Sequence, residues 1–429
     1  MDSAEGSASD LPADPEARLP SDESTDYLSW TSLSVRMADS GRSDEGRRAG
    51  VWAIGELAEQ LGEGWMLQVA RSEGAAPMEL LLSPFHAVAF GELLDLALRL
   101  HLLHDLEGMA TVRRDLKRDL RKQRRLHTRV VLSVAALAMQ SGYQVALEKR
   151  LAADLAPTDV VITLPSGQAL VAEAFAVMTD QVMRQGMDYT DGLMQQIGRI
   201  CWGNGVELDG HLEALLTDEA TTEWLAEVAE AATLVGNDGA ARVIAHPAGR
   251  VTVRSSADAA ASGASFTGPI VTGKGSDRLG SILRRKAGQA AASGATWLCA
   301  EVFDGLWQFT QWAGWSLPAK GEAIASEVRQ ALLDIPGIVG VVLSCGPAMA
   351  QGDFVAESAR LGGGGFVLRR VFAPFRVRET VILPLRAGHD WDSVAWTQLY
   401  DREPEWLDWA LGKVNLPALS KVLAPRVEP

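Results

Sequence analysis

The segment from Thr158 to Val177 restricts the fold of this chain more than any other. It reads TDVVITLPSGQALVAEAFAV, two apolar runs separated by Pro-Ser-Gly. Residues 165–167 form a plausible three-residue hairpin loop, in which glycine takes the left-handed position. Such a loop fixes the register, so that Leu164 faces Gln168 and the numbers of facing residues add up to 332. The sequence therefore predicts an antiparallel hairpin.

This register places two acids opposite each other. Asp159 and Glu173 face across the ladder with side chains about 4.5 to 5.5 Å apart. Like charges so close repel, and the surrounding Val, Ile, Leu and Ala residues add a desolvation cost, so the pair needs a cation or a shared proton. A divalent metal is the simplest compensator. Carboxylates suit Mg²⁺ or Mn²⁺, ions that activate water for phosphodiester cleavage.

Periodicity along the chain predicts an α/β protein. A helix over 112–140, strands YQVALEKR, TDVVITL and QALVAEAFAV, then a helix and a further strand give the order helix, three strands, helix, strand over 112–255. Residues 31–111 are predicted to form an N-terminal α/β segment with strands at SLSVRM, WMLQVARS and PMELLLS. An Ala/Ser/Gly-rich loop or linker over 256–277 leads to a C-terminal α/β region over 278–429.

The order of elements and the two acids resemble the PD-(D/E)XK nuclease superfamily, which has the restriction-endonuclease-like fold. PTD ends at Asp159 where the family has PD, and Glu173 stands for the second acid. The resemblance implies a Mg²⁺- or Mn²⁺-dependent nuclease acting on DNA or RNA, with both acids as catalytic metal ligands. The family's lysine, two residues after the second acid, is Phe175 here. An apolar ring cannot polarise water, so an active enzyme needs a substitute.

The first strand of the core offers that substitute. Lys149 is the nearest candidate for the missing catalytic lysine, and Glu148 is the candidate third metal ligand. Strand alternation puts these two neighbours on opposite faces. The chain is therefore predicted to be either a divergent nuclease or a non-catalytic module that binds nucleic acid or protein through the same fold. A third alternative is an unrelated α/β protein in which Glu173 pairs with a helix-borne arginine such as Arg199.

Charge is distributed unevenly along the chain. The net charge is −15, yet residues 113–129 carry nine bases and two acids. A basic helix in this segment could contact nucleic-acid phosphates. The alternative is a solvated helix face on which Asp115 and Asp119 form ion pairs with the bases. Residues 1–30, by contrast, carry eight acids and one base and are predicted to be a disordered acidic tail. The predicted phosphate contacts recur at helical steps: Arg114, Lys117, Arg118, Arg121 and Arg125.

Composition excludes several classes of protein. Hydrophobic residues make up 47% and charged residues 22%, which is ordinary for a globular chain. The three cysteines have no zinc-site or disulfide-framework spacing. The acidic N-terminus lacks the pattern of a signal peptide, and no run of about 18 apolar residues occurs. These features predict a cytoplasmic protein without a membrane partner.

Overall fold

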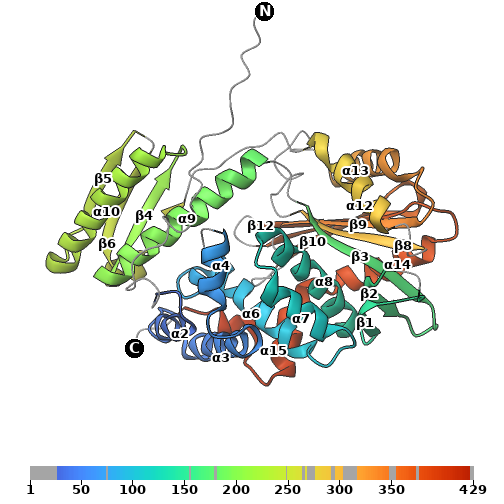
Figure 1. Ribbon diagram of the computed structural model, residues 1–429, viewed down its shortest axis with the longest axis horizontal. Helices are drawn as coiled ribbons and strands as arrows, with labels where there is room; N and C mark the ends of the chain where they lie inside the picture. The colour runs from blue at the N-terminus through green and yellow to red at the C-terminus, as the bar shows by residue number, and fades with distance from the viewer. Residues whose placement is uncertain are drawn as a thin grey trace, which may run out of the picture.

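The computed structural model describes residues 27–425 except 74–75, 154–155, 178–180, 248, 263–265, 268–275, 291–294, 303–315, 347–353 and 373–375. Residues 1–26 of the predicted acidic tail therefore lie outside the described residues. The fold is mixed α/β, as expected. An eight-stranded sheet with helices on both faces forms the main body, and a separate four-stranded sheet lies at one end (Figure 1).

The large sheet contains the predicted hairpin near one edge. Its order is β1-β2-β3-β8-β9-β12-β11-β10. Strands β1 to β3 are antiparallel, β3, β8 and β9 are parallel, and β12, β11 and β10 are antiparallel again. The strands are β1 Gln144–Lys149, β2 Thr158–Thr163, β3 Ala169–Val177, β8 Thr296–Val302, β9 Ile338–Cys345, β10 Phe354–Arg360, β11 Phe366–Phe372 and β12 Arg376–Pro384.

The hairpin between β2 and β3 has the predicted register. Val160 pairs with Ala172, and Thr163 pairs with Ala169. The Leu164 amide donates to the Gln168 carbonyl at 2.8 Å, which closes the three-residue loop. Gly167 has φ +84°, the left-handed conformation that a glycine adopts without strain. Loop chemistry alone was enough to set this register, because both partners lie within a few residues of the turn.

The N-terminal part is helical, which corrects the predicted α/β segment. Its helices are α2 Trp30–Ala38, α3 Asp44–Leu61, α4 Trp65–Glu73, α5 Met78–Leu81 and α6 Ala87–Leu102. The three predicted strands fall in α2, α4 and α5. In α2 the buried residues Trp30, Leu33 and Met37 recur at helical spacing, and the Ser29 hydroxyl accepts from the Ser32 amide as an N-cap. Short apolar runs fit both periods, and packing against the neighbouring helices favoured the helix.

The predicted helix over 112–140 is two helices joined by an elbow. They are α7 Met109–Arg118 and α8 Lys122–Gln140. Asp119 leaves the helical region with φ −95° and ψ 89°, and its carboxylate accepts from the Arg121 guanidinium in the turn. The second half of α8 is buried against β1, β2 and β3, as its apolar sequence predicts.

A complete module is inserted between β3 and β8, which corrects the predicted core over 112–255. The module has its own sheet, of order β5-β6-β4-β7, and its own core around Trp224 and Val228. It consists of α9 Gln181–Asn204, β4 Val206–Leu212, α10 Asp218–Asp238, β5 Arg242–His246, β6 Gly249–Ser255, α11 Ser256–Ser262 and β7 Phe266–Thr267. The predicted linker thus contains α11 and β7, while 268–275 lie outside the described residues. Apolar periodicity predicts each strand but not which strand pairs with it. Here α9 and β4, which follow β3 in sequence, belong to the inserted module and not to the large sheet.

The crossover that returns to β3 uses α12 Ser276–Ala290, and β8 then runs parallel to β3. Helices α12 and α13 Leu317–Leu332 share a core with one face of the sheet, where Phe175 lies. The opposite face packs with α8 and with the C-terminal helices α14 Asp390–Asp401, α15 Trp406–Lys413 and α16 Leu419–Val422. None of the helices in the described part of the chain is long and apolar enough to cross a bilayer.

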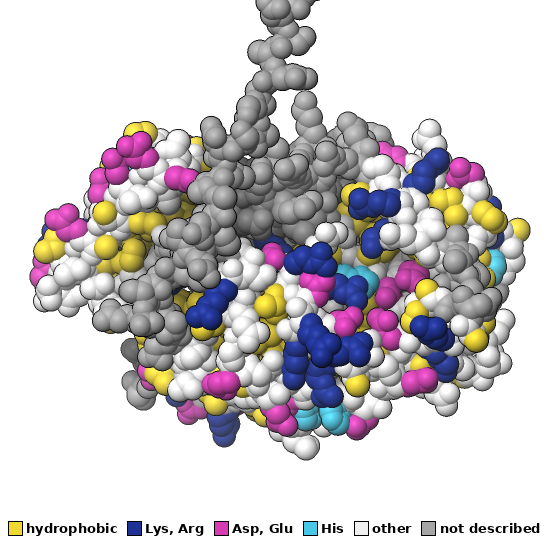
Figure 2. All heavy atoms as spheres, in the orientation of Figure 1, with side chains coloured by type: hydrophobic (Ala, Val, Ile, Leu, Met, Phe, Trp, Pro, Cys, Tyr) yellow, Lys and Arg dark blue, Asp and Glu magenta, His cyan; other side chains and the backbone are white. Residues whose placement is uncertain are grey.

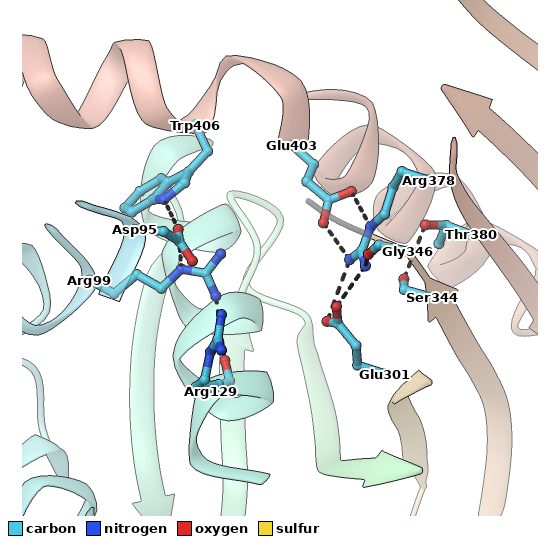
Figure 3. Close-up of polar contacts among 10 residues, drawn as sticks. All are labelled: Asp95, Arg99, Arg129, Glu301, Ser344, Gly346, Arg378, Thr380, Glu403 and Trp406. Carbon is cyan, nitrogen blue, oxygen red and sulfur yellow. Dashed lines mark hydrogen bonds and ion pairs between the residues drawn. The ribbon is translucent and has the colours of Figure 1, made fainter. Parts of the chain in front are cut away.

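A buried ion network ties the C-terminal helices to the sheet (Figure 3). Arg378 on β12 is 1% exposed and contacts Glu301 of β8 at 2.7 Å and Glu403 at 2.6 Å. The same guanidinium donates to the Gly346 carbonyl at 2.7 Å. A charge this deep is stable only with such partners, so Arg378 holds the segment before α15 against the carboxyl ends of β8 and β9.

Candidate active site

The candidate site begins where β2 and β3 separate. The ladder between them ends at the pair of Val160 and Ala172. One step further, the Ala174 amide donates to the Asp159 carboxylate at 2.8 Å instead of to a strand carbonyl. Asp159 is only 9% exposed, and β3 continues beside β8 with Glu173 opposite Leu298. The sheet thus opens at Asp159, and a carboxylate fills the gap.

The structure brings the two predicted acids together. Glu173 is half-buried and forms a hydrogen bond with the Asp159 carboxylate. Burial, followed by the negative charge of Asp159, raises the pKa of Glu173 to about 9. A pKa raised this far favours the protonated form of the Glu173 carboxyl beside Asp159.

Glu148 lies near the pair, and Lys149 is paired elsewhere. Burial, and then the charge of Asp159, raises the pKa of Glu148 to about 7. Glu148 lies within β1 but has a left-handed φ of +49°, and the pairing of β1 with β2 skips it. The Lys149 ammonium lies 3.3 Å from the carboxylate of Glu107, which comes just before α7. The ion pair therefore gives Lys149 a partner outside the carboxyl pair.

A different lysine lies near the carboxyl pair. Phe175 is 2% exposed in the core beneath α12, and the Lys286 ammonium of α12 lies 5.7 Å from the centre of its ring. The positive charge of Lys286 opposes the rise in the pKa of Glu173. Lys286 is half-buried among the core positions Leu279, Leu283 and Ala287 of its helix. A lysine at a position of helical apolar spacing is the sequence signal that could have identified it.

A histidine approaches the pair from α8. The His127 Nε2 atom lies 3.7 Å from an Asp159 carboxylate oxygen, and the ring hydrogen-bonds to the backbone of Ala174. Burial is the largest effect on the pKa of His127 and lowers it from its ordinary value, which favours the neutral imidazole. A neutral imidazole can accept a proton or bind a metal. Sequence analysis missed His127 because it lies in the middle of a basic run.

The predicted phosphate contacts do not share one helix face. Arg114, Lys117 and Arg118 are exposed on α7, and Arg121 lies in the turn beside Asp119. Arg125 is half-buried on α8 and donates to the Leu120 carbonyl. Figure 2 shows Lys and Arg side chains gathered over α7 and the start of α8, beside acidic and histidine side chains. We call the residues Arg114, Lys117, Arg118 and Arg121 the basic elbow.

The elbow and the carboxyl pair belong to one electrostatic environment. Arg124 bridges the two helices, because its guanidinium contacts Asp115 of α7 at 3.0 Å. The positive charges of Arg124 and Arg114 both oppose the rise in the pKa of Glu148. Arg199, the predicted alternative partner for Glu173, interacts with Tyr27 and not with that glutamate.

Across the described residues, no three or more His, Cys, Asp or Glu side chains are already grouped to hold a metal ion. Mg²⁺ is commonly bound through one or two carboxylates and several waters, so the pair itself suits a hydrated ion. Burial and the nearby negative charge of Asp159 raise the pKa of Glu173, and the same two conditions favour the binding of a cation. Asp159 and Glu173 would be the ligands of such an ion, and Glu148 and His127 lie next to them.

Comparison with known proteins adds no relative: no protein-family model, curated protein or solved structure matches this chain.

Proposed function

We propose that this protein is a metal-dependent phosphodiesterase of nucleic acid, built on a restriction-endonuclease-like core. The observation that carries the proposal is the Asp159–Glu173 pair at the opening between β2 and β3. A protonated carboxyl hydrogen-bonded to a buried carboxylate is a poor structural contact, because a well-packed apolar pair would cost less to bury. A site that exchanges the shared proton for a divalent cation explains why both acids are present.

The order of elements around the pair supports this fold. With the inserted module set aside, the chain runs α8, then antiparallel β1, β2 and β3, then α12, then β8 parallel to β3. This is helix, three strands, helix, strand, the order that the resemblance implies. The two acids stand at the start of the second strand and within the third.

The residues of the site can divide the reaction among them. A bound Mg²⁺ or Mn²⁺ would supply Lewis-acid stabilisation of the phosphate and an activated water. Asp159 and Glu173 would hold it, and Glu173 would lose its proton in doing so. Lys286 would place positive charge beside the phosphate, replacing the lysine that Phe175 excludes. His127 is neutral and can accept a proton, and the basic elbow would bind neighbouring phosphates.

The second candidate function is non-catalytic binding of nucleic acid on the same fold. It is favoured by Phe175 at the usual lysine position and by the ion pair of Lys149 with Glu107. The two candidates differ in whether Lys286 acts as the missing cation.

A cleavage assay with labelled single- and double-stranded DNA and RNA tests the proposal. We expect cleavage that requires Mg²⁺ or Mn²⁺ and falls at least about 100-fold in Asp159→Asn and in Glu173→Gln. Lys286→Ala should cause a loss of similar size, and Lys286→Arg should retain part of the activity because it keeps the charge. Lys149→Ala should cleave normally. The exposed acid Glu227 provides a matched control through Glu227→Gln.

Three results decide between the candidates. Oligonucleotide binding without cleavage under any metal condition supports the non-catalytic function. Cleavage that survives Glu173→Gln removes the carboxyl pair from the mechanism. Cleavage that survives Lys286→Ala but not Lys149→Ala returns the catalytic role to the lysine of β1.

A further inference from the structure

The basic elbow carries positive charge that its own surroundings do not neutralise. Lys117 and Arg118 are exposed, and neither has an acidic partner among the residues that the structure describes. Arg114 lies 3.6 Å from Asp115, whose carboxylate also contacts Arg124, so one acid serves two arginines. Arg121 is paired with Asp119, and Arg129 is paired with Glu92 of α6, so the charge without an acidic partner in the described residues comes chiefly from Lys117 and Arg118. A surface of this kind attracts a polyanion over distances of about a Debye length.

The chain contains its own polyanion of matching size. Residues 1–26 hold eight acids against Arg18 alone, a net charge of −7. The bases and acids of 113–129 sum to +7. Residues 31–111, between these two segments, hold twelve acids and six bases, so their net charge of −6 is spread over a chain three times as long as the N-terminal segment. The acids of this N-terminal segment are Asp2, Glu5, Asp10, Asp14, Glu16, Asp22, Glu23 and Asp26.

The acidic segment joins the described chain close to the elbow. Just after Tyr27, the ring of Trp30 stacks on Trp65 with centroids 6.3 Å apart. The Trp65 indole in turn donates to the Leu116 carbonyl at 3.1 Å, next to Lys117 in α7. Tyr27 is three residues before Trp30, a distance of about 11 Å or less along the chain. The stacked rings of Trp30 and Trp65 then connect this point to α7. A 26-residue coil has a typical end-to-end distance of about 30 Å, which is ample.

We infer that residues 1–26 bind the basic elbow within the same chain and compete there with nucleic acid. The inference rests on the proposed function, since it assigns that site a built-in competitor. A tethered segment acts at an effective concentration of about 1 mM, so weak charge pairing is enough to occupy the surface. A nucleic acid with higher charge density displaces it, whereas weakly charged ligands do not. The segment thus selects for long or high-affinity polyanions.

Zero-length cross-linking with a carbodiimide tests the contact without any nucleic acid. The reagent joins an Asp or Glu carboxylate to a lysine amine as an amide, taking up the water that is lost. We expect peptides linking an acid of 1–26 to Lys117, and their loss at high salt. Lys117→Arg keeps the charge but removes the amine, so it should abolish that cross-link alone. Segment acids that cross-link elsewhere, to Lys149 or Lys413 but not to Lys117 or Lys122, would overturn the inference.

Oligonucleotide binding tests the competition. A full-length variant with all eight segment acids changed to Asn or Gln should bind a labelled oligonucleotide about tenfold more tightly at low salt. The difference should vanish at high salt, where both contacts are screened. Lys117→Glu with Arg118→Glu should weaken binding in either background. Equal affinities of the wild type and the neutralised variant would refute competition. If neither protein binds nucleic acid, the proposed function fails, while the cross-link still decides the contact.

Discussion

In the absence of metal, Glu173 should make this protein less stable as the pH rises. Its pKa in the folded protein is about 9, against an ordinary 4.5. Between these values the folded state holds a proton that the unfolded state has released. The free energy of unfolding therefore falls with pH in this range. The stabilising contribution of the protonated carboxyl is fully present below about 4.5 and is lost by about 9.

The size of the effect follows from linkage. One proton held only in the folded state costs about 1.4 kcal/mol per pH unit, so at most about 2.7 kcal/mol is lost between pH 6 and pH 8. Partial solvent access at the half-buried side chain reduces this to about 2 kcal/mol, or a few degrees in Tm. Glu173→Gln keeps the volume and a hydrogen-bond donor toward Asp159 but cannot ionise. The variant should lose less stability than the wild type over the same range.

Thermal denaturation in a chelating buffer from pH 5.5 to pH 9 provides the measurement. We expect the Tm of the wild type to fall more steeply with pH than that of Glu173→Gln. Adding Mg²⁺ or Mn²⁺ at pH 8 should stabilise the wild type only, because the ion replaces the shared proton. Glu227→Gln, which alters an exposed acid of α10, should follow the wild type. Parallel pH profiles for wild type and Glu173→Gln would refute the shared-proton arrangement.

Two further substitutions test how the scaffold is held together. Arg378→Met leaves the buried Glu403 and the partly buried Glu301 without their cation, so we expect a loss of about 3 to 5 kcal/mol in urea denaturation, and an unchanged midpoint would show that the network is not needed. Gly108→Ala should be far more harmful than Gly142→Ala: both have positive φ, but a Cβ at Gly108 would lie 1.8 Å from the Leu147 carbonyl, while nothing lies within 4 Å at Gly142. Gly142→Ala, the matched control, should lower the free energy of unfolding by about 1 kcal/mol. Equal losses in the two variants would contradict close packing of α7 on β1.

Sequence alone determined the features that depend on neighbours along the chain. The register of β2 with β3 follows from Gly167 and a three-residue loop, and it places Asp159 and Glu173 one step beyond the last paired residues, Val160 and Ala172. The strand β9 is also marked in the sequence, because GIVGVVLS at 337–344 is an almost wholly apolar run of strand length. The raised pKa of Glu173 was predictable too, because two carboxyl groups close together in apolar surroundings oppose each other's ionisation.

Tertiary structure decided everything that depends on which distant segments meet. The sheet neighbour of β3 is β8, beyond an inserted module that has its own core, and no local pattern specifies that choice. The N-terminal runs became helices because helical faces were available to pack against. His127 of α8 lies 3.7 Å from Asp159, and Lys286 of α12 lies over the ring of Phe175; both helices are remote from Glu173 in sequence. The sequence therefore determined the acids of the candidate site, and only packing determined the cation and the imidazole beside them.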